Sequence, residues 1–421
     1  MTEKKPLISM TTMRWGIVVA ATLVLAVAAG GRFLIGIVFD QVRDSFQITH
    51  GTLGLVVTLN VLVIAITQPL VGWLVDKMPA RYVTGGGMAL VGIGLVLTGV
   101  SETLFSLFFG YGLIVALGLA AVSPVAVTPV VAGWFQKKRA TALSIVNAGG
   151  SVGQLAIVPA LTVTVGTIGW QLSYIYLGIG LAVIGGPLLL LLLREREETS
   201  EGPSDAGYGC NVYTALKSSS FWMLGWGFLV CGITMAWVMT FFVDYALLTG
   251  LSRNNAAVGL SLMGGMSIIG ALMMGWWADR SGKLLPLAVT YALRGGGFVM
   301  LFLAGASFPL MLIAMTMIGI SWTATVPLTS AISADLYGRL RLGTIFGMMF
   351  AVMPLGSAIG SAAAGFLYDL TGSYDVSLWM NAAIGIAAGI VVYLVHSRPL
   401  FDREAQQQQM NSQTPATVHA D

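Results

Sequence analysis

The motif Gly72-Trp73-Leu74-Val75-Asp76-Lys77 recurs as Gly275-Trp276-Trp277-Ala278-Asp279-Arg280 in the second part of the chain. The two aspartates are 203 residues apart. A second pair of segments has about the same spacing: Trp134-Phe135-Gln136-Lys137-Lys138-Arg139 matches Tyr337-Gly338-Arg339-Leu340-Arg341. Two motifs repeated at one offset predict a chain made of two copies of one structural unit.

The composition around these motifs excludes a water-soluble fold. The chain has 421 residues, of which 56% are hydrophobic and 9% are charged, whereas soluble domains carry about 25% charged residues. The two cysteines, Cys210 and Cys231, are too few for a disulfide-stabilised extracellular scaffold. The net charge of +3 gives no reason to expect a nucleic-acid partner. What remains is a polytopic membrane protein in contact with the lipid bilayer.

Twelve apolar runs are long enough to cross a bilayer as helices, which takes about 20 residues each. The runs are continuous rather than alternating, which favours helices over strands. We therefore expect an all-α membrane protein with twelve transmembrane helices in two six-helix halves. The predicted spans are 15–38, 52–75, 82–100, 104–134, 141–165, 170–193, 220–244, 255–278, 284–305, 307–333, 343–368 and 376–396.

The long hydrophilic segments predict the boundaries of the two halves. Residues 194–219 form a polar linker between an N-terminal half, 1–193, and a C-terminal half, 220–397. The tail 398–421 is polar, and we expect it to be disordered and cytoplasmic.

The lysines and arginines predict the orientation. With both termini inside, 17 of the 21 lie on the cytoplasmic side, against Arg43 and Arg253 on the other. This asymmetry follows the positive-inside rule. It predicts a multi-pass protein of the cytoplasmic (bacterial inner) membrane with both termini in the cytoplasm.

The loop after the second span carries a family resemblance. Gly72, Asp76 and Lys77, with Arg81 four residues further on, resemble the signature loop of the major facilitator superfamily, and the copy at 275–280 fits as well. The resemblance implies two halves that alternate around a substrate site near the bilayer midplane.

In such a loop, a carboxylate beside helix ends can accept from exposed backbone N–H groups and pair with basic residues, which would latch the halves when the inside is closed. The alternative is a charge cluster that only sets topology. The candidate latch residues are Asp76, Lys77, Arg81, Asp279 and Arg280.

A second resemblance covers the region from Gly118 to Tyr174. It is similar to the monocarboxylate transporter family and its bacterial relatives, which include the oxalate/formate exchangers. This resemblance implies a small organic anion, usually a monocarboxylate, moved with a proton or by exchange. The segments that carry it are Ala120-Ala121-Val122-Ser123-Pro124, Gly133-Trp134-Phe135, Asn147-Ala148-Gly149-Gly150, Gly169-Trp170 and Asp335-Leu336-Tyr337-Gly338.

The chain departs from that family at its charged positions within the spans. The positions that match the family's Asp and Arg in span eight are Ser267 and Ala271, and the exchangers' Lys position in span eleven falls near Met353. All three are uncharged here, so the family's proton and anion residues cannot be transferred to this chain.

Two arginines inside spans take the place of those residues in our prediction. Arg32 lies in span one, which lines the central cavity in this fold, and Arg294 lies near the middle of span nine. An arginine at mid-bilayer costs at least about 2.5–3.5 kcal/mol, so it requires a partner, water or a substrate anion. Arg32 is a candidate for binding a carboxylate bidentately, or for a structural pair with Asp244 or helix carbonyls. Arg294 is a candidate for the same binding, or for a structural or snorkelling role.

The remaining candidates are weaker. Polar side chains in spans more often join helices, and aromatic side chains more often pack than bind substrate. No acid lies in the middle of a span, so two acids at outer span ends, Asp40 and Asp244, are the candidates for proton coupling. The further substrate-site candidates are Phe33, Asn60, Asn147, Gln154, Trp237, Phe241 and Trp322.

These residues favour a secondary active transporter for a small organic anion, working as a monomer by alternating access with a proton or a counter-anion. The alternatives are an anion exchanger and a multidrug or hydrophobic-compound exporter, although an exporter of cations would want an acid within the membrane. A membrane enzyme or receptor finds no support, because the sequence has no nucleophile–base pair, no metal-ligand cluster and no sign of a cofactor.

Overall fold

A computed structural model describes residues 10–48, 50–135, 138–193, 209–395 and 398–400. Within these ranges, the side chains of 10–14, 27, 29–34, 36–37, 40, 50–51, 154–159 and 162 are outside the description. The described residues form helices and no strand, and they contain one isolated bridge between Gly209 and Gly338.

The helices of the N-terminal part are α1 (Met10–Ile37), α2 (Phe39–Phe46), α3 (His50–Lys77), α4 (Ala80–Gly99), α5 (Leu104–Leu107), α6 (Ala116–Ala121), α7 (Pro124–Trp134), α8 (Arg139–Ile168), α9 (Trp170–Gly180) and α10 (Gly186–Leu192). Two π-helical segments, η1 (Phe108–Val115) and η2 (Leu181–Gly185), continue α5 and α9. The later helices are α11 (Val212–Lys217), α12 (Ser219–Leu248), α13 (Arg253–Ser281), α14 (Leu284–Ala304), α15 (Phe308–Trp322), α16 (Thr325–Tyr337), α17 (Leu342–Thr371) and α18 (Asp375–Tyr393).

These helices confirm the predicted fold class. Ten helical segments in the described residues are long and apolar enough to cross a membrane. The other two predicted spans, 15–38 and 141–165, correspond to α1 and α8. The molecule is therefore an all-α protein with twelve membrane-crossing helices.

Two spans are interrupted at matching places. Span four breaks between α6 and α7, and span ten breaks between α15 and α16. Pro124 and Pro327, 203 residues apart, lie just after these breaks. Proline lacks a backbone N–H, so it is tolerated where a helix restarts.

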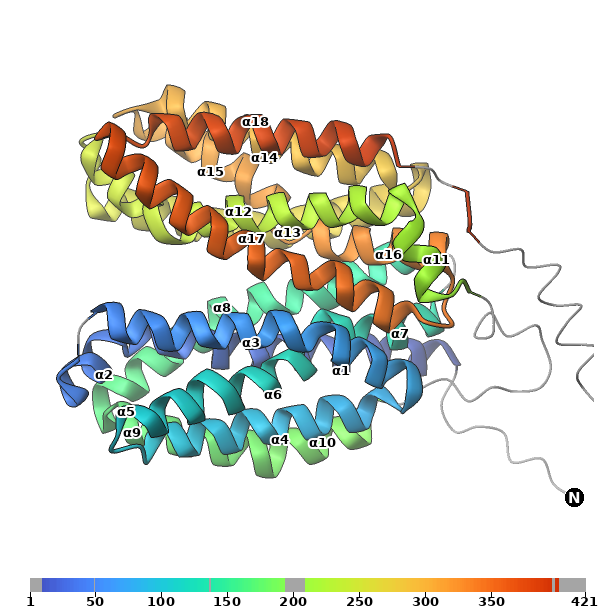
Figure 1. The fold of residues 1–421 in the computed structure, drawn as a ribbon, viewed down its shortest axis with the longest axis horizontal. Coiled ribbons are helices and arrows are strands. Elements are labelled where there is room, and N and C mark those ends of the chain that lie inside the picture. Colours follow the sequence, from blue (N-terminus) through green and yellow to red (C-terminus); the bar gives the residue numbers. More distant parts are fainter. Residues whose placement is uncertain (1–9, 49, 136–137, 194–208, 396–397, 401–421) are drawn as a thin grey trace, which may run out of the picture.

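The helices gather into two bundles, α1–α10 and α12–α18 (Figure 1). Within each bundle, helices cross closely at glycines, and the crossing of α1 with α8 matches that of α12 with α17. A Cβ atom added at Gly153 of α8 would overlap the carbonyl of Ala26 in α1, and one added at Gly356 of α17 would overlap that of Leu229 in α12. Gly153 and Gly356 are 203 residues apart, so both bundles use the same close packing of backbones.

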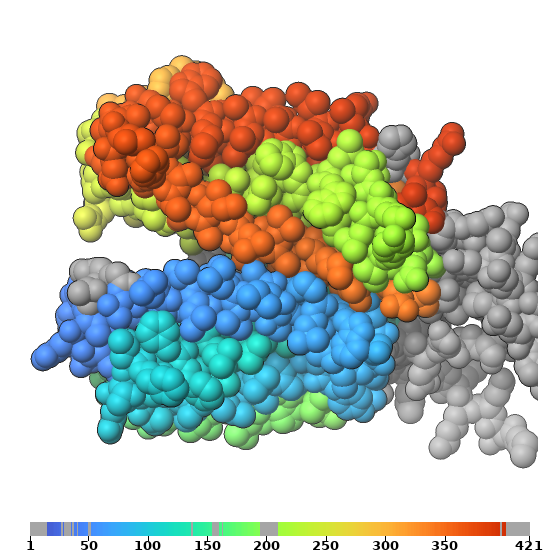
Figure 2. Space-filling view, in the orientation of Figure 1, coloured from blue at the N-terminus to red at the C-terminus, as the bar shows by residue number. Residues whose placement is uncertain are grey.

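The two bundles meet at one end and separate toward the other (Figure 2). Contact lies at the end where α3 and α13 finish, which we call the basic end because Lys77, Arg139 and Arg280 lie there. The opposite end carries α2, with Arg43, and the start of α13. The most extensive contacts between the bundles are those of α3 with α17 and of α8 with α13, and α7 and α8 also contact α16.

Candidate functional site

Asp76, in the last turn of α3, joins the N-terminal bundle to the C-terminal bundle. Its carboxylate accepts hydrogen bonds from the backbone nitrogens of Gly343 at 2.8 Å and Thr344 at 2.7 Å, and from the Thr344 hydroxyl at 2.5 Å. Gly343 and Thr344 lie in the first turn of α17, where backbone N–H groups have no partner within the helix. A carboxylate there also complements the positive end of the helix dipole.

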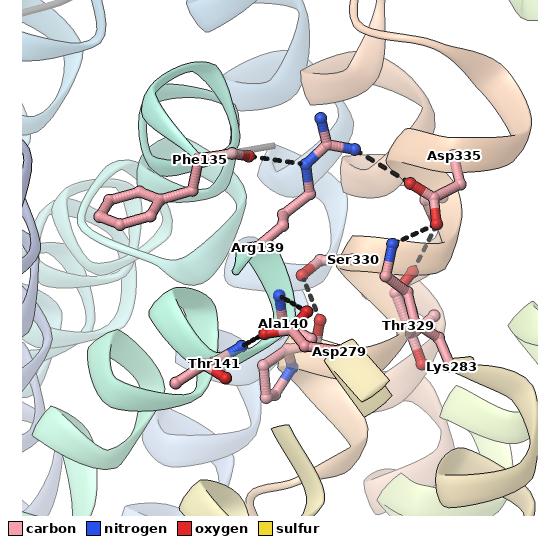
Figure 3. Close-up of polar contacts among 11 residues, drawn as sticks. Phe135, Arg139, Ala140, Thr141, Asp279, Lys283, Thr329, Ser330 and Asp335 are labelled. Atoms are coloured by element: carbon pink, nitrogen blue, oxygen red, sulfur yellow. Dashed lines mark hydrogen bonds and ion pairs between the residues drawn. The ribbon is translucent and has the colours of Figure 1, made fainter. Parts of the chain in front are cut away.

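Asp279, at the end of α13, makes the same contact in the reverse direction (Figure 3). Its carboxylate accepts from the backbone nitrogens of Ala140 at 3.0 Å and Thr141 at 2.8 Å, in the first turn of α8. Asp76 and Asp279 are 203 residues apart, and so are Ala140 and Gly343. Each bundle therefore supplies one carboxylate, which binds the first turn of a helix in the other bundle. The two contacts are related by the same 203-residue offset as the sequence repeat.

The glycines of the two motifs make these contacts possible. A Cβ atom at Gly72 would overlap the carbonyl of Gly343, and a Cβ atom at Gly275 would overlap the side chain of Ser144 in α8. Side chains at either position would push the helices apart. The first residue of each repeated motif is thus set by the close approach of the two bundles.

A cluster of three charged residues, Arg139, Lys283 and Asp335, joins the two bundles beside Asp279 (Figure 3). Arg139 of α8 pairs with Asp335 of α16, with Nη1 and Oδ1 3.1 Å apart, and its Nε donates to the carbonyl of Phe135. Lys283, before α14, pairs with the other oxygen of Asp335. The sequence does not predict this contact, although Arg139 lies in a repeated motif and Asp335 in one of the segments similar to monocarboxylate transporters.

The basic residues of the predicted latch lie elsewhere. Lys77 lies over the ring of Trp73, with Nζ 4.2 Å from the ring centroid, and Arg280 lies over Trp276 at 3.8 Å. Arg81 lies over its neighbour Tyr82 at 4.9 Å. Each of these cations lies over a ring of its own bundle, so among the predicted latch residues the hydrogen bonds across the boundary come from the two acids.

The boundary between α8 and α13 continues inward from Asp279. Ser267 of α13 donates to the hydroxyl of Ser151 in α8 at 3.0 Å, and both side chains are buried. Ser151 is ten residues beyond Thr141, which is about 15 Å along the helix and hence near the middle of a bilayer. The hydroxyl of Thr323, at the break in span ten, donates to the carbonyl of Ser267.

Arg294 is fully buried within the C-terminal bundle, with an exposed fraction of 0%. Its Nη2 donates to the carbonyls of Ser321 and Trp322, the latter at 3.0 Å, and its Nε donates to the Ser321 hydroxyl at 3.3 Å. Its Nη1 contacts the sulfur of Cys231 at 3.0 Å and the hydroxyl of Thr234 at 3.4 Å. The guanidinium therefore satisfies carbonyls left open at the end of α15, where span ten breaks.

The other described candidates in spans are held within their own bundles. Asn60 donates to the carbonyl of Tyr111 in η1 at 2.7 Å, and Asn147 donates to Leu143 one turn earlier. Trp237 is buried against α18, where its indole N–H donates to Ser377 at 2.8 Å. Phe241 contacts Tyr374, with ring centroids 5.6 Å apart.

Trp322 ends α15 and is partly exposed, with its ring 6.0 Å from the guanidinium carbon of Arg294. The side chains of Arg32, Phe33, Asp40 and Gln154 lie outside the described residues. Among the described candidates, Arg294 lies against Trp322, and Trp237 and Phe241 both pack on Tyr374, while the acids at the basic end form the best-defined site.

Asp244, near the end of α12, accepts a hydrogen bond from the hydroxyl of Tyr374 at 2.7 Å. Tyr374 lies in the turn between α17 and α18, and burial together with this carboxylate raises the pKa of its phenol. Across the described part of the chain, no three His, Cys, Asp or Glu side chains gather as metal ligands.

The fold and its repeat now have a match among known proteins. The family model described as Major Facilitator Superfamily matches residues 21–323 and 227–418. The chain belongs to the major facilitator superfamily. It is therefore a multi-pass membrane protein of a transporter family.

Members of the superfamily named monocarboxylate transporters are among its relatives. Human monocarboxylate transporter 11 is 27% identical over 405 residues, which is 92% of this chain and 84% of the relative. Monocarboxylate transporter 12-B of Danio rerio is 23% identical over 359 residues, 78% of this chain and 75% of the relative.

Solved structures confirm the fold. The fucose:proton symporter of E. coli superposes with a TM-score of 0.74 at 16% identity, covering 90% of this chain and 98% of that one. The proton:xylose symporter also has a TM-score of 0.74, at 14% identity, covering 95% of this chain and 100% of that one.

Proposed function

We propose that this protein is a secondary active transporter that moves a small organic anion of the monocarboxylate class across the cytoplasmic membrane. Transport proceeds by alternating access: the two bundles rock about the bound anion, and a proton moves with it. The basic end faces the cytoplasm, in line with the positive-inside rule.

The observation that carries the proposal is the pair of carboxylates, Asp76 and Asp279, each at the first turn of a helix in the other bundle. These contacts close the basic end while the bundles separate at the opposite end (Figure 2). Rocking must break them, because α17 and α8 then move away from α3 and α13. Such contacts stabilise a state that is open to the outside, and they have to break and re-form in every transport cycle.

Two observations support an anion as the substrate. Relatives named monocarboxylate transporters match up to 92% of the chain. The spans also carry two arginines, Arg32 and Arg294, but no acid near their centres. A cationic interior attracts carboxylates and repels cations.

Arg32 is the proposed direct ligand of the carboxylate. Ala26 marks the place where α1 packs closely on α8, and the backbone of Arg32 lies six residues further along α1. Arg32 is therefore about 9 Å further from the closed basic end, toward the end where the bundles separate. Asp40 and Asp244 are the proposed carriers of the coupled proton. Exchange against a counter-anion is the second candidate, favoured by the lack of an acid at the span centres, where a coupled proton usually binds.

Uptake of radiolabelled acetate, pyruvate and lactate into proteoliposomes tests this function. Wild-type protein should accumulate at least one of them, and Arg32→Ala should abolish that uptake, while Arg43→Ala at the outer surface should retain it. A wild-type protein that takes up none of these anions would overturn the proposal, and so would normal uptake by Arg32→Ala. Uptake that persists with a protonophore but needs an internal anion would replace proton symport by exchange.

A further inference from the structure

The centre of the C-terminal bundle holds a positive charge with no negative partner. Arg294 is the eleventh of the 21 residues of α14, so its Cα lies about 15 Å from either end of the helix. Its acceptors are two carbonyls, two hydroxyls and a thiol. Among the residues that the structure describes, no carboxylate pairs with it.

This charge lies close behind the boundary between the bundles. Arg294 donates to the carbonyl of Trp322, and the next residue, Thr323, donates to the carbonyl of Ser267. Ser267 in turn donates to Ser151 of the other bundle. Trp322 itself is partly exposed, and its ring centroid is 6.0 Å from the guanidinium carbon of Arg294.

We propose that Arg294 makes the transport path selective for anions through its field, without touching the substrate. The neutral acceptors hold the guanidinium in place and leave its charge uncancelled. The inference rests on the proposed function in that the anion concerned is the transported carboxylate. Arg294 is thus a specificity-determining residue that acts from behind Trp322.

The distances give the size of the effect. The guanidinium carbon is 6.0 Å from the Trp322 ring centroid, and an anion against the far face of the ring would lie about 3.5 Å further away. With an effective dielectric constant of about 20, the attraction over this distance favours a monovalent anion on the order of tenfold. A cation is disfavoured by a similar factor.

Cys231 allows the charge to be cancelled without removing the arginine. Its sulfur is 3.0 Å from Nη1 of Arg294, and the side chain is fully buried. Cys231→Asp places a carboxylate against the guanidinium, while Cys231→Asn has nearly the same shape and no charge. Thr234→Asp and Thr234→Asn form a second matched pair at the same nitrogen, for use if the first pair does not fold.

The experiment compares each Asp variant with its Asn control by two measurements. The first is the KM for carboxylate uptake into proteoliposomes. The second is the quenching of Trp322 fluorescence by iodide relative to neutral acrylamide, obtained by subtracting the signal of Trp322→Phe in the same background. Iodide quenching needs no substrate, so it reports the field even if the proposed function fails.

We expect Cys231→Asp to raise KM about tenfold over Cys231→Asn and to lower the iodide-to-acrylamide quenching ratio several-fold, because the added acid cancels the field. Equal values for Asp and Asn in both measurements would overturn the inference. A wild-type protein that transports no carboxylate but shows the quenching difference would overturn the proposed function and leave the anion-selective field standing.

Discussion

The carboxylate of Asp76 in α3 accepts a hydrogen bond from the backbone nitrogen of Gly343 in α17, 2.8 Å away, across the boundary between the two bundles. Hydrogen bonds to a charged group contribute about 1.5–3 kcal/mol each, and Asp76 and Asp279 together accept five of them. The closed basic end therefore depends on these two carboxyl side chains.

Asp76→Asn and Asp279→Asn should each open the basic end more often, because the amide keeps an acceptor but loses the charge that favours the helix N-terminus. A cysteine introduced at the buried Ser144, in a chain with Cys210 and Cys231 replaced by alanine, reports this opening through its rate of alkylation. We expect at least a tenfold faster rate in either variant. Asp369→Asn, near the opposite end of α17, is the matched control, and a rate unchanged from it would contradict the assignment.

Gly72→Ala tests the close approach of α3 and α17 by sterics alone. The added Cβ would overlap the carbonyl of Gly343, whereas a Cβ at Gly86 in α4 meets no atom within 4 Å. Gly72→Ala should therefore lower the uptake rate about tenfold and speed alkylation at position 144, and Gly86→Ala should change neither. Wild-type behaviour of Gly72→Ala would show that the two helices can separate at no cost.

The sequence predicts those parts of this site that follow from the repeat. The repeat identified Asp76 and Asp279, because a helix that ends in an acid at the same place in both copies has a common environment. It did not identify their partners, Gly343 and Ala140, because those are backbone groups of the other bundle.

Other assignments depend on whether a side chain faces the inside of its own bundle or the other bundle. Trp237 is a substrate-site candidate by sequence, but its indole N–H donates to the hydroxyl of Ser377 in α18, inside the bundle. Asp335 gave no signal as a partner of Arg139, since 196 residues separate them and the contact has no copy at the matching position, which is Ala132. Neither a face nor a one-sided contact can be read from hydropathy, because both depend on tertiary packing.

Asp335→Asn should weaken the contact between α8 and α16 in a salt-dependent way. The change leaves Arg139 and Lys283 facing a neutral side chain, so their mutual repulsion replaces two attractions. Because Asp335 is partly exposed, salt screens the repulsion. Alkylation of a cysteine at position 144 should therefore be faster than in wild type at low salt, and the difference should shrink at high salt. A difference that is the same at both salt concentrations would exclude an electrostatic role for this cluster.

Cys210 should react slowly with N-ethylmaleimide in the folded protein. Its side chain is only 6% exposed, its backbone nitrogen donates to the carbonyl of Tyr337, and burial raises the pKa of its thiol. The reactive species is the thiolate, so alkylation at neutral pH should be at least tenfold slower than in detergent-denatured protein.

The raised pKa of the Cys210 thiol also predicts how the stability of the protein varies with pH. The unfolded thiol ionises at its ordinary pKa of about 8.5, while the folded thiol stays protonated to higher pH. Ionisation then favours the unfolded state, so the stability contributed by Cys210 is complete below pH 8.5 and is lost as the pH rises above it. Melting temperatures of wild type and Cys210→Ser between neutral and alkaline pH measure the effect. As the pH rises, the melting temperature of wild type should fall further than that of the serine variant. Parallel plots of melting temperature against pH would show that the thiol ionises equally in the folded and unfolded states.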